Sequence, residues 1–223
     1  MTNIIVGGFL GSSVGLLFCA SRIVALLSSV TDFIRIVVRT SPTFGPWNGD
    51  GYGFLLGCLF CFGSKVGLYH SIFLPIILIE MERGETSILG SVDECTLVLV
   101  SAGICAANVL TSSDALPRRG LKINVLYGDF IEVAYPYMER SNIVNVSAYL
   151  ACGLSTEILY RNDPGSVMSS AYFPLPLSIL LARDHFRIAF AMFSAFFVSF
   201  GGTLLSKLVS SKSTRPGLSE KAE

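Results

Sequence analysis

The feature that constrains this chain most is a series of apolar runs, each about as long as a membrane-spanning helix. The hydrocarbon core of a bilayer is roughly 30 Å thick, so a helix needs about 20 apolar residues to cross it. Only 14% of the residues are charged, whereas a soluble domain usually has about a quarter. We therefore expect an all-α, polytopic transmembrane helix bundle. The segments that approach the spanning length are 4–30, 52–79, 88–110, 143–160, 167–182 and 187–209.

The charges in the connections predict on which side of the membrane each connection lies. Lys and Arg are enriched in cytoplasmic loops, so we expect the acidic 80–94 connection outside and the basic 111–122 connection inside. The basic C-terminal tail is expected inside as well. An even number of crossings must then separate 111–122 from the tail. The polar segment 123–138 meets this requirement if it crosses too, or if it and another short segment re-enter the membrane. We expect about six to seven spans, with one broken or re-entrant polar segment.

Two regions follow from this pattern, a transmembrane helical domain over 1–209 and a disordered polar tail over 210–223. Residues 4–30 are interpreted as the first membrane helix rather than a signal peptide, because no Lys or Arg precedes them. Gly7 and Gly11 form a G-x-x-x-G pattern, which lets a second helix approach closely.

The 123–140 segment holds the first candidate site. Asp129 and Glu132 are three residues apart, so a helix would carry both carboxylates on one face. Gly128 and Pro136 flank them and weaken the helix. Broken helices that carry charged groups at membrane depth are a recurring substrate site in transporters. The alternative is an interfacial loop whose acids are simply solvated.

Lys65 and His70 are the second pair of candidates, because both lie inside the long apolar run 52–79. Lys65 could neutralise Asp129 or Glu132, which would make both charges tolerable at depth. His70 titrates near neutral pH and suits a proton relay, although a single histidine in an apolar helix is more often a hydrogen-bonded packing residue. The residues able to bend this run are Gly63, Gly67 and Pro75.

Other polar residues receive structural interpretations. Glu157 precedes Arg161 by four residues, which favours a local ion pair. Asp93 and Glu94 are expected at the start of the third helix, where negative charge complements the helix dipole. The two prolines of 167–182 should kink or break that segment, which suits a gate or a re-entrant element.

The remaining motifs give no sign of catalysis or of a cofactor. His70 and His185 are far apart and neither has metal-ligand spacing. Cys58 and Cys61 form a C-x-x-C, but apolar neighbours surround them and we interpret them as packing residues. No nucleophile–base pair presents itself, so we expect no enzyme, no cofactor and no metal. The net charge is zero and no basic stripe is interleaved with aromatic residues, which argues against nucleic acid as a partner.

Residues Gly128-Asp129-Phe130-Ile131-Glu132, followed by Pro136-Tyr137, resemble the membrane components of sugar phosphotransferase systems. They are similar to the perfringolysin-regulator-type proteins grouped with those components. The resemblance covers about 63–182. It implies a membrane-embedded site in which Glu132, close to a proline, holds a sugar hydroxyl.

These observations predict a transporter or permease-like protein for a small polar solute in a bacterial inner membrane. Asp129 and Glu132 would line the site, Lys65 would offset their charge, and His70 would relay a proton. Its expected surroundings are the lipid bilayer and a homo-oligomer or partner membrane subunit. The alternative is a non-transporting scaffold or assembly subunit of a larger complex.

Overall fold

In a computed structural model of the chain, the structure describes Ser29, Asp32, Phe33 and Ile36 and the ranges 51–82, 87–128, 131–161 and 173–213. The chain divides into two compact units, Met1–Thr40 and Ser41–Glu223. The four described residues of the first unit are helical. The predicted span 4–30, with Gly7 and Gly11, therefore lies outside the described residues except for Ser29.

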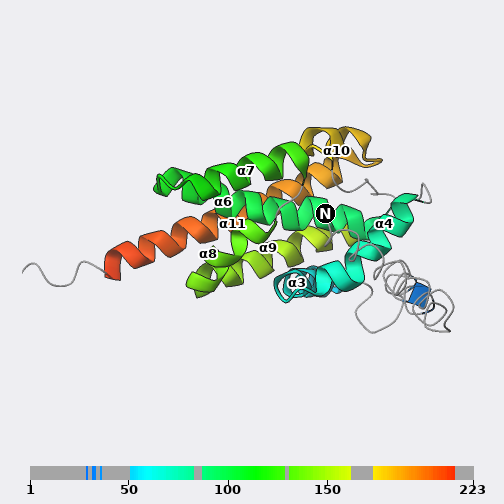
Figure 1. The fold of residues 1–223 in the computed structure, drawn as a ribbon, viewed down its shortest axis with the longest axis horizontal. Helices are drawn as coiled ribbons and strands as arrows, with labels where there is room; N and C mark the ends of the chain where they lie inside the picture. Colours follow the sequence, from blue (N-terminus) through cyan, green and yellow to red (C-terminus); the bar gives the residue numbers. More distant parts are fainter. Residues whose placement is uncertain are drawn as a thin grey trace, which may run out of the picture. The chain divides into compact units, whose positions relative to one another are not determined.

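The second unit confirms the predicted all-helical class, because its described ranges contain helices and no β-strand (Figure 1). Two segments, η1 and η2, are π-helical, and η3 is a 3₁₀ turn. The elements in chain order are α3 (Tyr52–Lys65), η1 (Tyr69–Phe73), α4 (Leu74–Glu82), α5 (Ile88–Val92), η2 (Asp93–Val98), α6 (Leu99–Thr111), α7 (Ala115–Tyr127), η3 (Ile131–Ala134), α8 (Tyr135–Arg140), α9 (Asn142–Tyr160), α10 (Leu175–Leu181) and α11 (His185–Ser213).

Three helices of the described ranges are long and apolar enough to cross a membrane, or four if the bent α3–η1–α4 arm counts as one span. The three are Ile88–Thr111, Asn142–Tyr160 and His185–Ser211. The described residues therefore do not support the expected six to seven spans. α11 also continues to Ser213, so the first residues of the predicted tail are helical.

The two shortest predicted spans account for part of this difference. Segment 123–138 is not one helix, since α7 ends at Tyr127, Gly128 adopts a left-handed conformation (φ 64°), and η3 and α8 follow. The described part of 167–182 contains only α10, a helix of 7 residues. α10 begins just after Pro174 and includes Pro176, in agreement with the predicted break.

The apolar run 52–79 is bent, as its glycines predicted. α3 and the η1–α4 helix meet at an angle of 107°. The Gly67 backbone has φ +83°, in the left-handed region that glycine adopts without steric cost. The amides of Val66 and Gly67 bond back to Phe62 and Ser64, which closes the end of α3.

The continuous helix α5–η2–α6 lies at the centre of this unit and is buried except near its C-terminal end, where Leu110 is exposed. α7, α9 and α11 pack against α6, and α3 packs along α9 (Figure 1). Glycines permit the closest approaches. A Cβ at Gly57 would lie 2.3 Å from the Cys152 carbonyl oxygen, and one at Gly103 would lie 2.5 Å from the Phe196 carbonyl oxygen. Such close backbone contacts are typical of helix packing in membranes.

The outer surface of the bundle is also apolar. Helix α11 exposes Phe186, Phe190, Phe193 and Phe197, the first of them to 90%. Helix α9 exposes Val146, Leu150 and Leu154. A helix that is apolar on both its packed and its exposed faces is typical of a membrane span.

Candidate functional site

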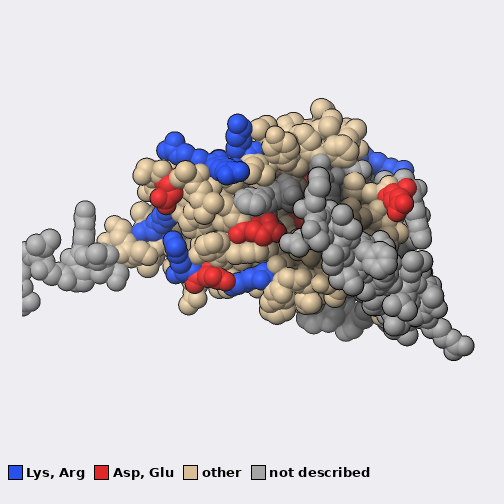
Figure 2. Space-filling view, in the orientation of Figure 1, with Lys and Arg blue, Asp and Glu red and all other residues tan. Residues whose placement is uncertain are grey.

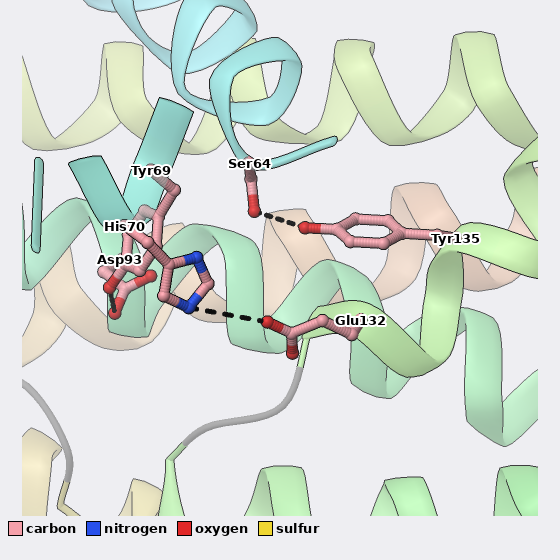
Figure 3. A network of polar contacts seen from close by, with 6 residues as sticks. All are labelled: Ser64, Tyr69, His70, Asp93, Glu132 and Tyr135. Atoms are coloured by element: carbon pink, nitrogen blue, oxygen red, sulfur yellow. Dashed lines mark hydrogen bonds and ion pairs between the residues drawn. The ribbon is translucent and has the colours of Figure 1, made fainter. Parts of the chain in front are cut away.

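The candidate site lies where the two π-helical segments meet. Tyr69 of η1 donates a hydrogen bond through its hydroxyl to Oδ2 of Asp93 in η2, at 2.8 Å (Figure 3). Both side chains are buried. π-helical segments are rare and occur frequently at functional sites. The described part of the chain therefore joins its two π segments through a buried carboxylate and a phenol.

Asp93 and Glu94 are not at the start of a helix, which corrects the sequence-based prediction. The helix begins at Ile88, where the Ser87 hydroxyl caps it by accepting a bond from the Gly90 amide at 3.0 Å. Both acids thus lie more than one turn inside a buried helix, and their exposed fractions are 5% and 0%. They face buried surroundings rather than solvent.

Glu94 belongs to a separate contact on the α10 side. Its Oε1 accepts a hydrogen bond from the hydroxyl of Ser178. Its Oε2 is buried and has no hydrogen-bond partner. The two neighbouring acids of η2 therefore bond to different elements. Asp93 bonds to the η1 segment, and Glu94 bonds to helix α10.

His70 and Glu132, both predicted site residues, lie close together. His70 Nε2 is 4.0 Å from Glu132 Oε1, and the two side chains are 61% and 47% exposed. In Figure 3 the imidazole points toward the carboxylate. The ring of His70 also meets that of Tyr69 edge-on, with centroids 5.3 Å apart. The half-exposed pair thus adjoins the buried Tyr69–Asp93 pair.

Ser64 and Tyr135 form the other side of this polar region. Their hydroxyl oxygens are 2.5 Å apart, which ties the end of α3 to the start of α8 (Figure 3). Burial raises the pKa of the Tyr135 hydroxyl above its usual value, and the bond from Ser64 opposes this only in part. Tyr135 therefore remains a neutral hydrogen-bonding group at physiological pH.

The structure does not pair Lys65 with Glu132. Lys65 Nζ instead donates to Oδ1 of Asn145 on α9, at 3.3 Å. Asp129 lies outside the described residues. Of the four predicted site residues, His70 and Glu132 are thus brought together, and Lys65 has another partner.

Glu157 has a structural role that differs from the predicted ion pair with Arg161. Its carboxylate accepts hydrogen bonds from the amides of Gly51 at 3.1 Å and Phe54 at 2.9 Å. These are open N–H groups at the start of α3, so a side chain of α9 caps a neighbouring helix. The spacing of Glu157 and Arg161 favoured an ion pair within α9. The packing of α3 against α9 could not be inferred from that spacing.

The residues that sequence analysis missed are Asp93, Tyr69, Glu94 and Ser178. One signal for them was present. Ser87 is a favourable N-cap residue, followed directly by an apolar run. With the predicted span 88–110 capped by Ser87, both acids lie beyond its first turn, where the helix-dipole explanation is weak.

The arrangement offers donors and acceptors along a line from a buried carboxylate to the surface. Ring contact rather than a hydrogen bond joins Tyr69 to His70, so a proton would need a bridging water at that step. No group of three or more His, Cys, Asp or Glu side chains in the described ranges could hold a metal ion. The five cysteines described there have free thiols.

Comparisons with known proteins give no relative from which a role could be carried over. No family model, no curated protein and no solved structure matches the chain.

Proposed function

We propose that this chain is an integral membrane protein that carries a small polar solute across the bilayer. Asp93 and Tyr69 form the inner end of its polar path, and His70 and Glu132 form the outer end. The basic connections favour a cytoplasmic C-terminus, in the manner of a bacterial inner-membrane protein. The resemblance of 128–137 to sugar phosphotransferase membrane components supports the same class.

One observation carries the proposal, a buried carboxylate at the inner end of a polar connection to the surface. Asp93 lies on the most deeply buried span, and its contact Tyr69 touches the half-exposed His70. Ionisable groups inside membrane segments are costly and mark substrate or ion paths by default. The break in the α3–η1–α4 arm beside them resembles the broken helices that form transporter sites.

Each residue has a role that follows from its chemistry. The Asp93 carboxylate accepts hydrogen bonds from hydroxyl or amino groups of a solute, and Tyr69 holds it in place. His70 and Glu132 exchange a proton with water at the mouth of the path. The Ser64–Tyr135 pair keeps the α3 end against α8, so that the path stays open on one side.

A second candidate is a non-transporting assembly subunit, and interhelical hydroxyl contacts favour it. Thr96 on η2 bonds with Ser155 on α9 at 3.2 Å, and Ser141 bonds with Ser206 on α11 at 2.6 Å. Contacts of this kind hold membrane helices together without any solute. The two candidates differ in whether water reaches Asp93.

Cysteine accessibility in proteoliposomes distinguishes them. The native six cysteines are replaced, and Glu132→Cys, His70→Cys and Asp93→Cys are treated with a water-soluble trimethylammonium-ethyl methanethiosulfonate. For a transporter we expect fast reaction at 132 and 70 and slower but complete reaction at 93. The matched control is Leu154→Cys, an exposed apolar position on α9, which should stay unlabelled in lipid. Protection of position 93, whether or not position 70 reacts, would favour the assembly subunit.

A further inference from the structure

Glu94 is an acidic side chain of η2 that takes no part in the Tyr69–Asp93 contact. It has no exposed surface, and its two oxygens have unequal surroundings. Oε1 accepts from Ser178 on α10, whereas Oε2 has no hydrogen-bond partner. The carboxyl group is therefore enclosed, with one open oxygen.

The charges around Glu94 do not compensate it. The charged group beside it is Asp93, a group of like sign, and the backbone N–H of Phe173 donates a hydrogen bond that offsets this repulsion only in part. The ion pairs His70–Glu132 and Arg187–Asp184 of the described ranges do not include Glu94. Burying an ionised carboxylate without a cation costs several kcal/mol, and a bound cation removes that cost.

The elements packed against η2 bring neutral groups. α9 contributes the hydroxyls of Ser155 and Thr156, which contact Thr96. α10 contributes Ser178, which also lies 3.5 Å from the carbonyl oxygen of Pro174. The first half of α11 buries Ile188, Ala191, Met192 and Ala195, and its largely buried cation, Arg187, pairs with Asp184.

We propose that Glu94 binds one small cation, a proton or an alkali ion, in a closed site between η2 and α10. The donors that face it are oxygens, the carboxylate and the Ser178 hydroxyl, with the Pro174 carbonyl behind them. Oxygen ligands suit hard cations and the proton, and exclude soft metals. The inference rests on the proposed function, because in a transporter this ion would be the one coupled to solute movement.

α10 forms one side of this site. It is short, it starts between two prolines, and it carries the hydroxyl that donates to Glu94 Oε1. We therefore expect loading of Glu94 to alter its contact with α10.

Infrared difference spectroscopy tests the site directly. The full chain is placed in lipid nanodiscs, and the spectrum of Glu94→Gln is subtracted from that of the unchanged protein. A carboxylic-acid carbonyl band that disappears in Glu94→Gln and titrates with pH supports a bound proton. A carboxylate band that shifts with added sodium chloride, but not with N-methylglucamine chloride, supports an alkali ion. A Glu94 carboxylate band that responds to neither pH nor sodium overturns the proposal.

Two further variants keep the result interpretable. Ser178→Ala should shift the Glu94 band, because the carboxyl group loses its hydrogen-bond donor. This variant retains Glu94, so it still tests the site if Glu94→Gln fails to fold. Glu157→Gln is the matched control, since Glu157 is a carboxylate with two amide partners and no place in the site. The transport proposal fails if a cysteine at position 93 is protected from the thiol reagent. The infrared measurement on Glu94 does not depend on that labelling result, so the two failures can be distinguished.

Discussion

At the residue scale, Glu157 satisfies open backbone groups of a helix other than its own. Helix N-termini leave N–H groups without intrahelical partners, and a capping side chain contributes about 1 kcal/mol. Because Glu157 accepts from both Gly51 and Phe54, we expect Glu157→Ala to lower the free energy of unfolding by about 1–2 kcal/mol. Thermal unfolding in detergent measures this. Glu139→Ala, at an exposed position on α8, should change it by less than about 0.5 kcal/mol. Equal effects would contradict the capping role.

The contact between Tyr69 and Asp93 makes a second prediction. A hydrogen bond to a charged group contributes about 1.5–3 kcal/mol, and a buried group that loses its donor carries a penalty. We expect Tyr69→Phe and Asp93→Asn to be non-additive, with a coupling of about 1 kcal/mol or more in a double-mutant cycle. The measurement is the free energy of unfolding of the four variants. Additivity within about 0.5 kcal/mol would show that the two side chains act separately.

Residue types in the sequence allowed one part of the site to be predicted but not the other. His70 and Glu132 stood out because ionisable groups are rare in apolar runs, and the structure brings them to 4.0 Å. Asp93 and Glu94 did not stand out, because a position near a predicted helix start gave them an ordinary explanation. Their burial depends on where the helix begins and on the packing of η1 and α10. Neither feature is encoded by local spacing.

At the element scale, the packing of α3 on α9 depends on a missing side chain. A Cβ at Gly57 would lie 2.3 Å from the Cys152 carbonyl oxygen and 2.6 Å from Thr156 Oγ1. Gly57→Ala must therefore separate the two helices, and we expect it to cost about 1–3 kcal/mol of unfolding free energy. Thermal unfolding in detergent is the measurement.

Gly201→Ala is the control for this prediction, because it is also a glycine inside a helix. A Cβ there meets nothing within 4 Å. Alanine has the higher helix propensity, so Gly201→Ala should be neutral or raise stability by up to about 1 kcal/mol. A loss at Gly201 as large as that at Gly57 would contradict the prediction, because the close approach of α3 to α9 would then not be what makes Gly57→Ala destabilising.

The positions of the helices along the chain were easier to predict than which of the helices are buried in the bundle. Apolar length identified Ile88–Thr111 and His185–Ser211 equally well, yet the first is buried except at its C-terminal end and the second is mostly exposed. In a soluble protein the contrast between apolar and polar faces would have told them apart. Lipid removes that contrast, since exposed residues are apolar as well. The bend at Gly67 could be predicted because it follows from one residue's backbone freedom.

At the scale of the whole bundle, three helix ends meet. Lys207 on α11 donates to Thr111 at the end of α6, at 2.5 Å, and Ser141 before α9 contacts Ser206 on α11. The end of α6, the start of α9 and the far end of α11 thus lie together. α7 follows α6 and carries Arg118, Arg119 and Lys122, and Figure 2 shows Lys and Arg over this helix. In the proposed topology this is the cytoplasmic side.

This arrangement meets the charge requirement with fewer crossings than the sequence suggested. The basic 111–122 connection and the C-terminal end need an even number of spans between them, and α9 and α11 supply two. In single-cysteine variants of a chain without its native cysteines, Ser113→Cys and Ser211→Cys should react with a membrane-impermeant maleimide from one side of sealed vesicles. Arg161→Cys and Arg183→Cys should react only from the opposite side, because they lie beyond the other ends of α9 and α11. Labelling of position 161 from the same side as position 113 would contradict this arrangement. It would require 123–138 to cross the membrane between them, as in the longer topology predicted from the apolar runs.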